Sequence, residues 1–170
     1  MANLEIIKFP DNRLKIVSSE VIPEYEKEEE LQSFIDDLIE TMYNAPGGIG
    51  ISAPQVGVHK RIIVVDARYH KKTTVSHGLV VLINPEIVYT EGSVIVREGC
   101  MSIPDYTGNV ERNNKIVVRG LDRYFKEIEI ETEGMEAVVF QHEIDHLNGT
   151  LFIDRIKNPS TDLFLRKKYL

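Results

Sequence analysis

The chain of 170 residues carries 20 Lys and Arg against 27 Asp and Glu, a net charge of −7, and 42% of its residues are hydrophobic. This composition is typical of a soluble globular protein, and the negative charge argues against nucleic acid or an anionic membrane as the main partner. The single cysteine excludes an internal disulfide. Since no apolar run resembles a signal peptide or a membrane span, we expect a cytoplasmic protein.

The first predicted element is an amphipathic helix over residues 23–44, and it starts at Pro23. Acidic residues fill its first turns, where the helix dipole favours negative charge. Its apolar residues recur with the helical period. They are Leu31, Phe34, Ile35, Leu38, Ile39 and Met42. The breaker sequence APGG, residues 45–48, ends the helix.

The middle of the chain is rich in β-branched residues separated by turn residues, a pattern typical of strands. The predicted strands cover residues 61–66, 79–85, 86–90, 93–98, 116–121 and 127–131. The segment LDRYFKE, residues 121–127, joins the last two as a predicted hairpin.

A second helix is predicted over residues 134–147, with Gly149 in the position of a C-terminal capping glycine. A short terminal helix is expected from Pro159. Helix, many strands and helix together predict an α+β fold, in which antiparallel or mixed sheets pack around the second helix. No repeat or linker interrupts the sequence, so we expect residues 1–170 to form a single domain.

The second helix carries the motif HEIDH, residues 142–146. His142 and His146 are four residues apart, so on a helix their side chains are neighbours and can reach one ion. Glu143 is rotated by about 100°, which lets it lean towards a ligand of the ion without binding the ion. The alternative to a metal site is that both histidines are hydrogen-bonded residues of the core. Burying two unpaired imidazoles costs several kcal/mol, and a bound metal would offset this cost. The motif therefore predicts a metal site.

A catalytic metal usually has three protein ligands. The candidates for the third ligand can be reduced by elimination. HExxH peptidases take it from a downstream glutamate or histidine, and this chain has neither after His146. Asp154 would be a hard oxygen ligand, whereas the Cys100 thiolate suits zinc or ferrous iron. We therefore predict that Cys100 completes the site, although a free cysteine is also often a small buried apolar residue.

The glycine-rich segment GGIGISAPQVG, residues 47–57, contains the pattern G-x-G-x-x-A of dinucleotide-binding proteins. That fingerprint follows a strand and opens a helix, whereas this segment follows a helix and is interrupted by Pro54. The dinucleotide interpretation is therefore disfavoured. Gly48 and Gly50 instead indicate a backbone that approaches another group closely.

Three segments, GIGISAPQ, EGCMS and QHEIDH, occur in this order and resemble the three motifs of the peptide deformylase family. The segments FPDNRL, INPEI and LFIDRI also resemble this family, so the likeness covers nearly the whole chain. The resemblance implies a metal-dependent hydrolase that removes the N-formyl group from nascent N-formylmethionyl polypeptides. It further implies ferrous iron as the usual metal, with zinc, nickel or cobalt as substitutes.

The resemblance also implies roles for individual residues. The metal ligands would be Cys100, His142 and His146, and the general acid–base would be Glu143. The oxyanion would be held by the side-chain amide of Gln55 and the backbone N–H of Met101. The substrate would contact Ile49, Gly50, Gly99, Val138 and Val139, the last two in an apolar methionine pocket with Met135.

Two residues depart from the usual family pattern: Ser52 replaces an alanine and Met101 replaces a leucine. The Ser52 hydroxyl is expected to disturb its tight loop slightly. A transient ribosome contact would fall to the basic tail residues Arg166, Lys167 and Lys168, although a solvated helix end fits them better.

Three alternatives stay open at this point. The first is an HExxH endopeptidase with Asp154 as third ligand. The second is a structural metal site within a binding module, for which no fourth ligand is evident; His59, His70 and His77 look like surface residues. The third is a catalytically weak deformylase-like binding protein, for which Ser52 is the only indication.

Overall fold

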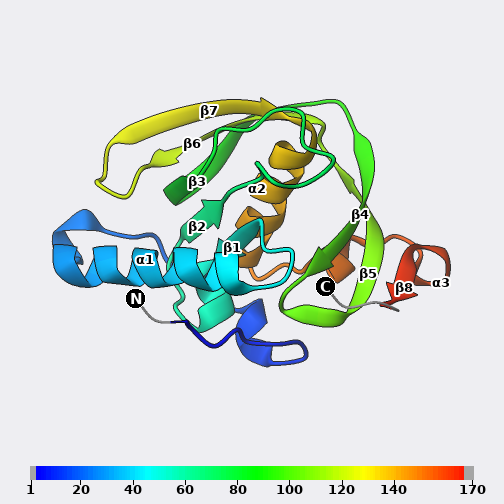
Figure 1. Ribbon diagram of the computed structural model, residues 1–170, viewed down its shortest axis with the longest axis horizontal. Coiled ribbons are helices and arrows are strands. Elements are labelled where there is room, and N and C mark those ends of the chain that lie inside the picture. Colours follow the sequence, from blue (N-terminus) through cyan, green and yellow to red (C-terminus); the bar gives the residue numbers. More distant parts are fainter. Residues whose placement is uncertain (1–2, 167–170) are drawn as a thin grey trace.

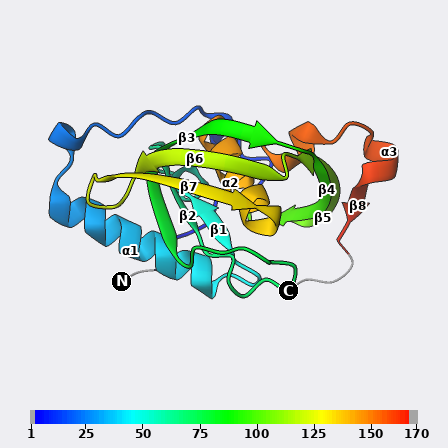
Figure 2. The same ribbon diagram turned by 90° about the horizontal axis from the view of Figure 1, so that it is seen from above.

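The computed structural model describes residues 3–166, and in these the helix α2 (Gly134–Leu147) lies between two antiparallel sheets (Figures 1 and 2). The larger sheet has the strand order β1-β2-β3-β6-β7 and the smaller sheet has the order β4-β5-β8. The larger sheet consists of β1 (Gly50–Ser52), β2 (Ile62–Val65), β3 (Val80–Glu91), β6 (Lys115–Leu121) and β7 (Glu127–Glu133). The smaller consists of β4 (Val94–Cys100), β5 (Ile103–Arg112) and β8 (Leu163–Leu165). The predicted α+β class is confirmed.

Strand β2 is buried on both faces because helices cover both sides of the larger sheet at this point. Successive side chains of a strand point to opposite faces. Ile62 and Val64 pack in the cluster that contains α1 (Glu28–Asn44), whereas Ile63 and Val65 pack in the cluster that contains α2. This explains why the sequence shows a continuous apolar run here instead of an alternating one.

The start of the first helix was predicted wrongly. Pro23–Tyr25 forms a separate 3-10 turn, after which Glu26 and Lys27 are extended and α1 begins at Glu28. The Glu26 carboxylate accepts hydrogen bonds from Lys60 at 2.7 and 3.0 Å. The ion pair with Lys60 holds Glu26 in the extended segment before α1. The run of acidic residues in the sequence did not reveal this long-range contact.

Two predicted strands, 79–85 and 86–90, form the single strand β3, with a register shift between Ile83 and Glu86. At the shift Asn84 has a φ of +53°, and its side chain donates to the Val21 carbonyl and accepts from the Val21 N–H. The strands β1, β5 and β8 were missed. The hairpin between β6 and β7 is confirmed.

Helix α2 is buried over nearly its whole length, and several of its polar side chains have partners inside the protein. Asp145 binds Arg112 and Arg155, and Glu136 accepts from the backbone N–H of His77. Gly149 follows the helix with a φ of +70°, as its predicted capping role requires. The short helix α3 (Pro159–Asp162) is also present. Within residues 3–166, none of the helices has the length and apolar character needed to cross a bilayer.

Candidate active site

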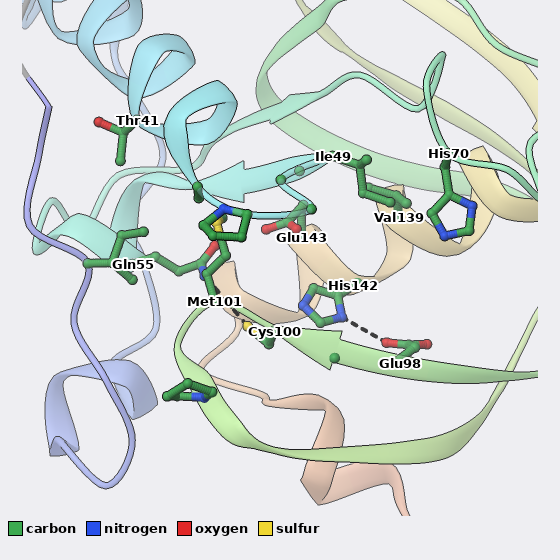
Figure 3. A pocket seen from close by; sticks show the side chains of 18 of the residues that line it. Thr41, Ile49, Gln55, His70, Glu98, Cys100, Met101, Val139, His142 and Glu143 are labelled. Carbon is green, nitrogen blue, oxygen red and sulfur yellow. Dashed lines mark hydrogen bonds and ion pairs between the residues drawn. The ribbon is translucent and has the colours of Figure 1, made fainter. Parts of the chain in front are cut away.

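A cleft of about 850 Å³ opens between the two sheets, and it is lined by residues of β1, β4 and α2. Strands β1 and β4 are each the outermost strand of their sheet, so their free edges border the cleft. Figure 3 shows Gln55, Cys100, His142 and Glu143 pointing towards one another in this cleft. Gln55, Cys100 and His142, which are separated by 45 and 42 positions in sequence, therefore meet only through the fold.

The thiol of Cys100 and the imidazoles of His142 and His146 form one group, whose potential ligand atoms all lie within 4.8 Å of one another. The Cys100 Sγ is 3.3 Å from His146 Nε2. Cys100 ends strand β4, and the two histidines share one face of α2, with ring centroids 5.2 Å apart. The three predicted ligands thus converge. Asp154 lies elsewhere, because its carboxylate accepts from the Leu151 N–H and from Lys15.

The orientation of His142 is set by Glu98, whose Oε1 lies 2.7 Å from His142 Nδ1. This contact occupies Nδ1 and leaves Nε2 for a metal. Glu98 accepts two further hydrogen bonds, at 2.7 and 2.9 Å, from the buried Arg112. Burial opposes ionisation of Glu98, but the hydrogen bonds from Arg112 and His142 prevail and lower its pKa to about 2. A carboxylate is therefore maintained behind His142.

The two imidazoles differ in their tendency to hold a proton. Burial lowers the pKa of His146 well below its usual range, so its ring is neutral and able to bind a metal. Burial also opposes protonation of His142, but hydrogen bonding to Cys100 and Glu98 raises its pKa well above the usual range. A cation bound by the Cys100 thiolate would compete with that proton, since metal ligands must be deprotonated.

Glu143 lies beside the ligand group in a buried position. Its Oε1 is buried without a hydrogen-bond partner among the described residues, and burial raises the pKa of the carboxyl to about 7. Such an unpartnered oxygen is costly unless a ligand or a water satisfies it. A carboxyl with a pKa near neutrality can both accept and release a proton under physiological conditions.

Gln55 is held by the loop that follows β1. Its Oε1 accepts from the backbone N–H of Ser52 at 3.0 Å and from the Ser52 hydroxyl at 3.1 Å. Its Nε2 consequently points to the other side, 3.6 Å from Cys100 Sγ and 3.1 Å from Ser102 Oγ. The loop therefore accommodates the Ser52 hydroxyl, which helps to orient the Gln55 amide.

Gly50 explains how strand β1 comes so close to α2. A Cβ atom at this position would lie 2.7 Å from Glu143 Oε2 and 2.7 Å from Val139 Cγ1. Gly48 lies even closer to the end of α1, where a Cβ would meet the Met42 carbonyl at 2.0 Å. The close approach predicted from these two glycines is present, and the approached groups are the two helices.

The apolar wall of the cleft includes Ile49, Val138 and Val139, all predicted to contact substrate, together with Met135. Gly99 and Met101 border the same space. The lining residues that were not predicted to belong to the site include His70, which was expected at the surface, Arg97 and Arg166. The sequence predicted no role for Glu98 beyond its place in the segment EGCMS, and nothing in the local pattern revealed that Arg112 would pair with it.

The arrangement fits a divalent transition metal. A soft thiolate and two imidazoles are the donors that such ions prefer, and three protein ligands leave a position open for chemistry. The Glu143 carboxyl group, whose Oε1 has no hydrogen-bond partner within residues 3–166, lies next to this group. The fold and the site together define a metal-dependent hydrolase of the HExxH class.

Comparison with known proteins agrees with this class. The family described as polypeptide deformylase matches residues 3–162. The peptide deformylase of Thermodesulfovibrio yellowstonii is 51% identical over 169 residues, which cover 99% of this chain and 98% of that protein. The peptide deformylase of Halothermothrix orenii is 50% identical over 156 residues, 92% of this chain and 95% of that protein.

Solved structures that resemble this chain are also peptide deformylases. The crystal structure of a peptide deformylase from Legionella pneumophila superposes with a TM-score of 0.81 and 41% identity, covering 92% of this chain and 87% of that one. The chain belongs to the polypeptide deformylase family. It is accordingly a metal-dependent hydrolase that removes the N-formyl group from nascent polypeptides.

Proposed function

We propose that Cys100, His142 and His146 hold the catalytic metal of this deformylase, and that Glu143 transfers the protons of the reaction. The observation that carries this proposal is the convergence of the three ligand atoms within 4.8 Å, next to a buried carboxylate oxygen that has no partner in the described part of the chain. We further propose that the whole chain, residues 1–170, forms one catalytic domain.

Ferrous iron is the metal that we propose, and zinc, nickel or cobalt would suit the same mixed sulfur and nitrogen ligands. When bound, such an ion lowers the pKa of a water molecule that it holds and polarises the carbonyl oxygen of the substrate. The Glu98 carboxylate keeps His142 in the tautomer that presents Nε2. A ligand thiol requires reducing surroundings, which supports a cytoplasmic location.

Glu143 would act first as a base and then as an acid. In its ionised form the carboxylate accepts a proton from the attacking water, and the resulting carboxylic acid delivers this proton to the departing amine. The burial that raises its pKa to about 7 suits both steps, because neither protonation state is strongly disfavoured near neutral pH.

Gln55 and Met101 would stabilise the negative charge that forms on the formyl oxygen. The Gln55 Nε2 already points towards Cys100, because its Oε1 is fixed by Ser52. The backbone N–H of Met101 follows directly after Cys100 and would be the second donor. Loss of one such donor typically costs about 3–4 kcal/mol of transition-state stabilisation.

The peptide would lie extended between the free edges of β1 and β4, where backbone groups are available for pairing. Ile49, Gly50 and Gly99 would flank its main chain, and the methionine side chain would enter the apolar wall formed by Val138 and Val139. A transient ribosome contact through the basic tail would involve Arg166, Lys167 and Lys168, of which the two lysines lie outside the described residues.

The role of Glu143 is tested by replacing it with alanine. We expect Glu143→Ala to bind one metal ion per chain like the wild type, while the rate of formate release from a formyl-Met peptide falls by about 10²–10⁴-fold. Metal content and formate release are measured on the same anaerobic preparation. Activity close to that of the wild type in a metal-loaded variant would show that another group transfers the proton.

The endopeptidase alternative is tested with the same protein. The wild type is incubated separately with a formyl-Met peptide and with an unblocked, unfolded protein. Formate release without internal cleavage is the expected result, because the ligand group contains Cys100 and does not contain Asp154.

A further inference from the structure

The outer face of the smaller sheet carries two arginines that the proposed mechanism does not use. Side chains alternate along a strand, so Arg97 and Gly99 of β4 face away from Glu98 and Cys100, which contact α2. Phe164 of β8 pairs in register with Thr107 of the intervening strand β5. The Arg97 guanidinium lies 3.6 Å above the Phe164 ring and donates to Asn109, so its partners are uncharged.

Arg166 continues this face one residue beyond β8, and its backbone N–H donates to the Asp105 carbonyl at 2.8 Å. Its guanidinium crosses to β4 over Gly99, where a Cβ atom would lie only 2.3 Å from Arg166 Nη2. The absence of a side chain at Gly99 therefore makes room for this arginine beside the cleft.

The Arg166 side chain has an unused donor in this position. Its Nε is buried without a hydrogen-bond partner among the described residues. Arg166 and Arg97 both line the cleft that contains Cys100, His142 and Glu143. A buried donor without an acceptor is costly, whereas a guanidinium binds a carboxylate with two parallel hydrogen bonds. The missing partner is therefore expected to come from a molecule in the cleft.

The geometry of β4 indicates which part of a substrate would provide the acceptor for Arg166. Gly99 directly precedes the proposed ligand Cys100, and Arg97 lies two residues further along the free edge. An extended peptide advances by about 3.3 Å per residue. With the formyl group beside Cys100, the residues that follow the methionine would pass the two guanidinium groups.

We propose that Arg166, assisted by Arg97, forms a carboxylate-binding subsite that makes this enzyme prefer an acidic side chain at the first or second residue after formylmethionine. This inference rests on the proposed function, since it places the formyl group at Cys100. The proposed subsite lies on the outer face of the smaller sheet, and its main residue, Arg166, follows strand β8 near the C-terminus.

The test compares kcat/KM for formate release from two amidated peptides, formyl-Met-Glu-Glu and formyl-Met-Gln-Gln, which differ in charge and hardly in size. For the wild type we expect a glutamate to glutamine ratio of about 10 at low ionic strength, and a smaller ratio at high salt because the contact is electrostatic. In Arg166→Gln the ratio should fall to about 1–2, with Arg166→Lys in between.

Arg119→Gln is the matched control, because it removes the same charge from the exposed surface of β6, where Arg119 pairs with Glu129. It should keep the ratio of the wild type. A wild-type ratio near 1, or an equal loss on both peptides in Arg166→Gln, would overturn the subsite. Formate release from the glutamine peptide by the wild type tests the proposed function alone. The ratio between the two peptides tests the subsite, so that failure of either proposal can be recognised.

Discussion

The Glu98 carboxylate links two buried groups, the His142 imidazole and the Arg112 guanidinium. It contacts His142 Nδ1 on one side and the Arg112 guanidinium on the other. Its side chain is 5% exposed and that of Arg112 is 2% exposed, so water cannot replace either contact. The position of one proposed metal ligand thus depends on a charge network that reaches through Arg112 to Asp145.

Replacement of Glu98 by glutamine should therefore weaken metal binding. The amide is nearly the same size as the carboxylate, but it removes the negative charge that fixes His142 and balances Arg112. We expect metal affinity to fall by about 10–100-fold, which is typical for partners of metal-binding histidines. Competition with a chelator measures this change. Glu111→Gln, an exposed position on β5, serves as the control, and an equal affinity in both variants would contradict the assigned role of Glu98.

The proposed ligands were predictable from sequence, because the spacing of His142 and His146 fixes their relation within one helix. Cys100 followed from elimination among the few remaining donors. Arg112 and Arg166 were not predictable, since their contacts depend on how β4, β5 and β8 align with one another. Local sequence patterns contain no information on this register.

Among the elements, β1 and α2 lie in close contact, and residues of both line the cleft. Gly50→Ala would place a methyl group 2.7 Å from both Glu143 Oε2 and Val139 Cγ1. Because one contact is with a packed side chain and the other with the proposed base, we expect about 1–3 kcal/mol of destabilisation and a loss of formate release. Urea unfolding and the formate assay measure the two effects.

The double variant Gly50→Ala/Val139→Ala tests this clash, since it removes one of the two clashing groups. Introducing Gly50→Ala into Val139→Ala should cost less free energy of unfolding than introducing it into the wild type. If the two substitutions are simply additive, then the close approach of β1 to α2 is not what requires a glycine.

The missed strand β5 and the wrongly predicted start of the first helix both depend on contacts between distant segments. The strand β5 contains Pro104 and Gly108, which local propensity disfavours, yet it pairs with both β4 and β8. Tertiary pairing overrides propensity at these positions. The first helix lost its expected first turn for a similar reason, because Glu26 pairs with Lys60 outside the helix.

At the scale of the whole molecule, Asp66 links the end of β2 to helix α1 and to the loop that follows. Its fully buried carboxylate accepts from the Tyr43 hydroxyl at 2.5 Å and from Arg68 at 2.8 and 3.0 Å. The hydrogen bonds from Arg68, followed by that from Tyr43, lower the pKa of Asp66 despite the opposing effect of burial.

This lowered pKa predicts the direction of a stability change with pH. Above the unfolded value of 3.8 the contribution of Asp66 is fully present. As the pH falls through the lower folded pKa, the unfolded chain binds the proton more readily and the contribution is lost. In Asp66→Asn, the free energy of unfolding should therefore depend less on pH between about 5 and 3 than in the wild type. Urea titrations across this range measure the difference, and parallel curves would contradict it.

We propose that deformylation depends on a metal ion that the Cys100 thiolate binds together with His142 and His146. The most direct measurement is the metal content of anaerobically prepared wild type and Cys100→Ala, both confirmed to be folded by circular dichroism. We predict about one ion per chain in the wild type and almost none in the variant, because two imidazoles alone bind far more weakly. A folded Cys100→Ala that retains one metal ion per chain would show that Cys100 is not a metal ligand.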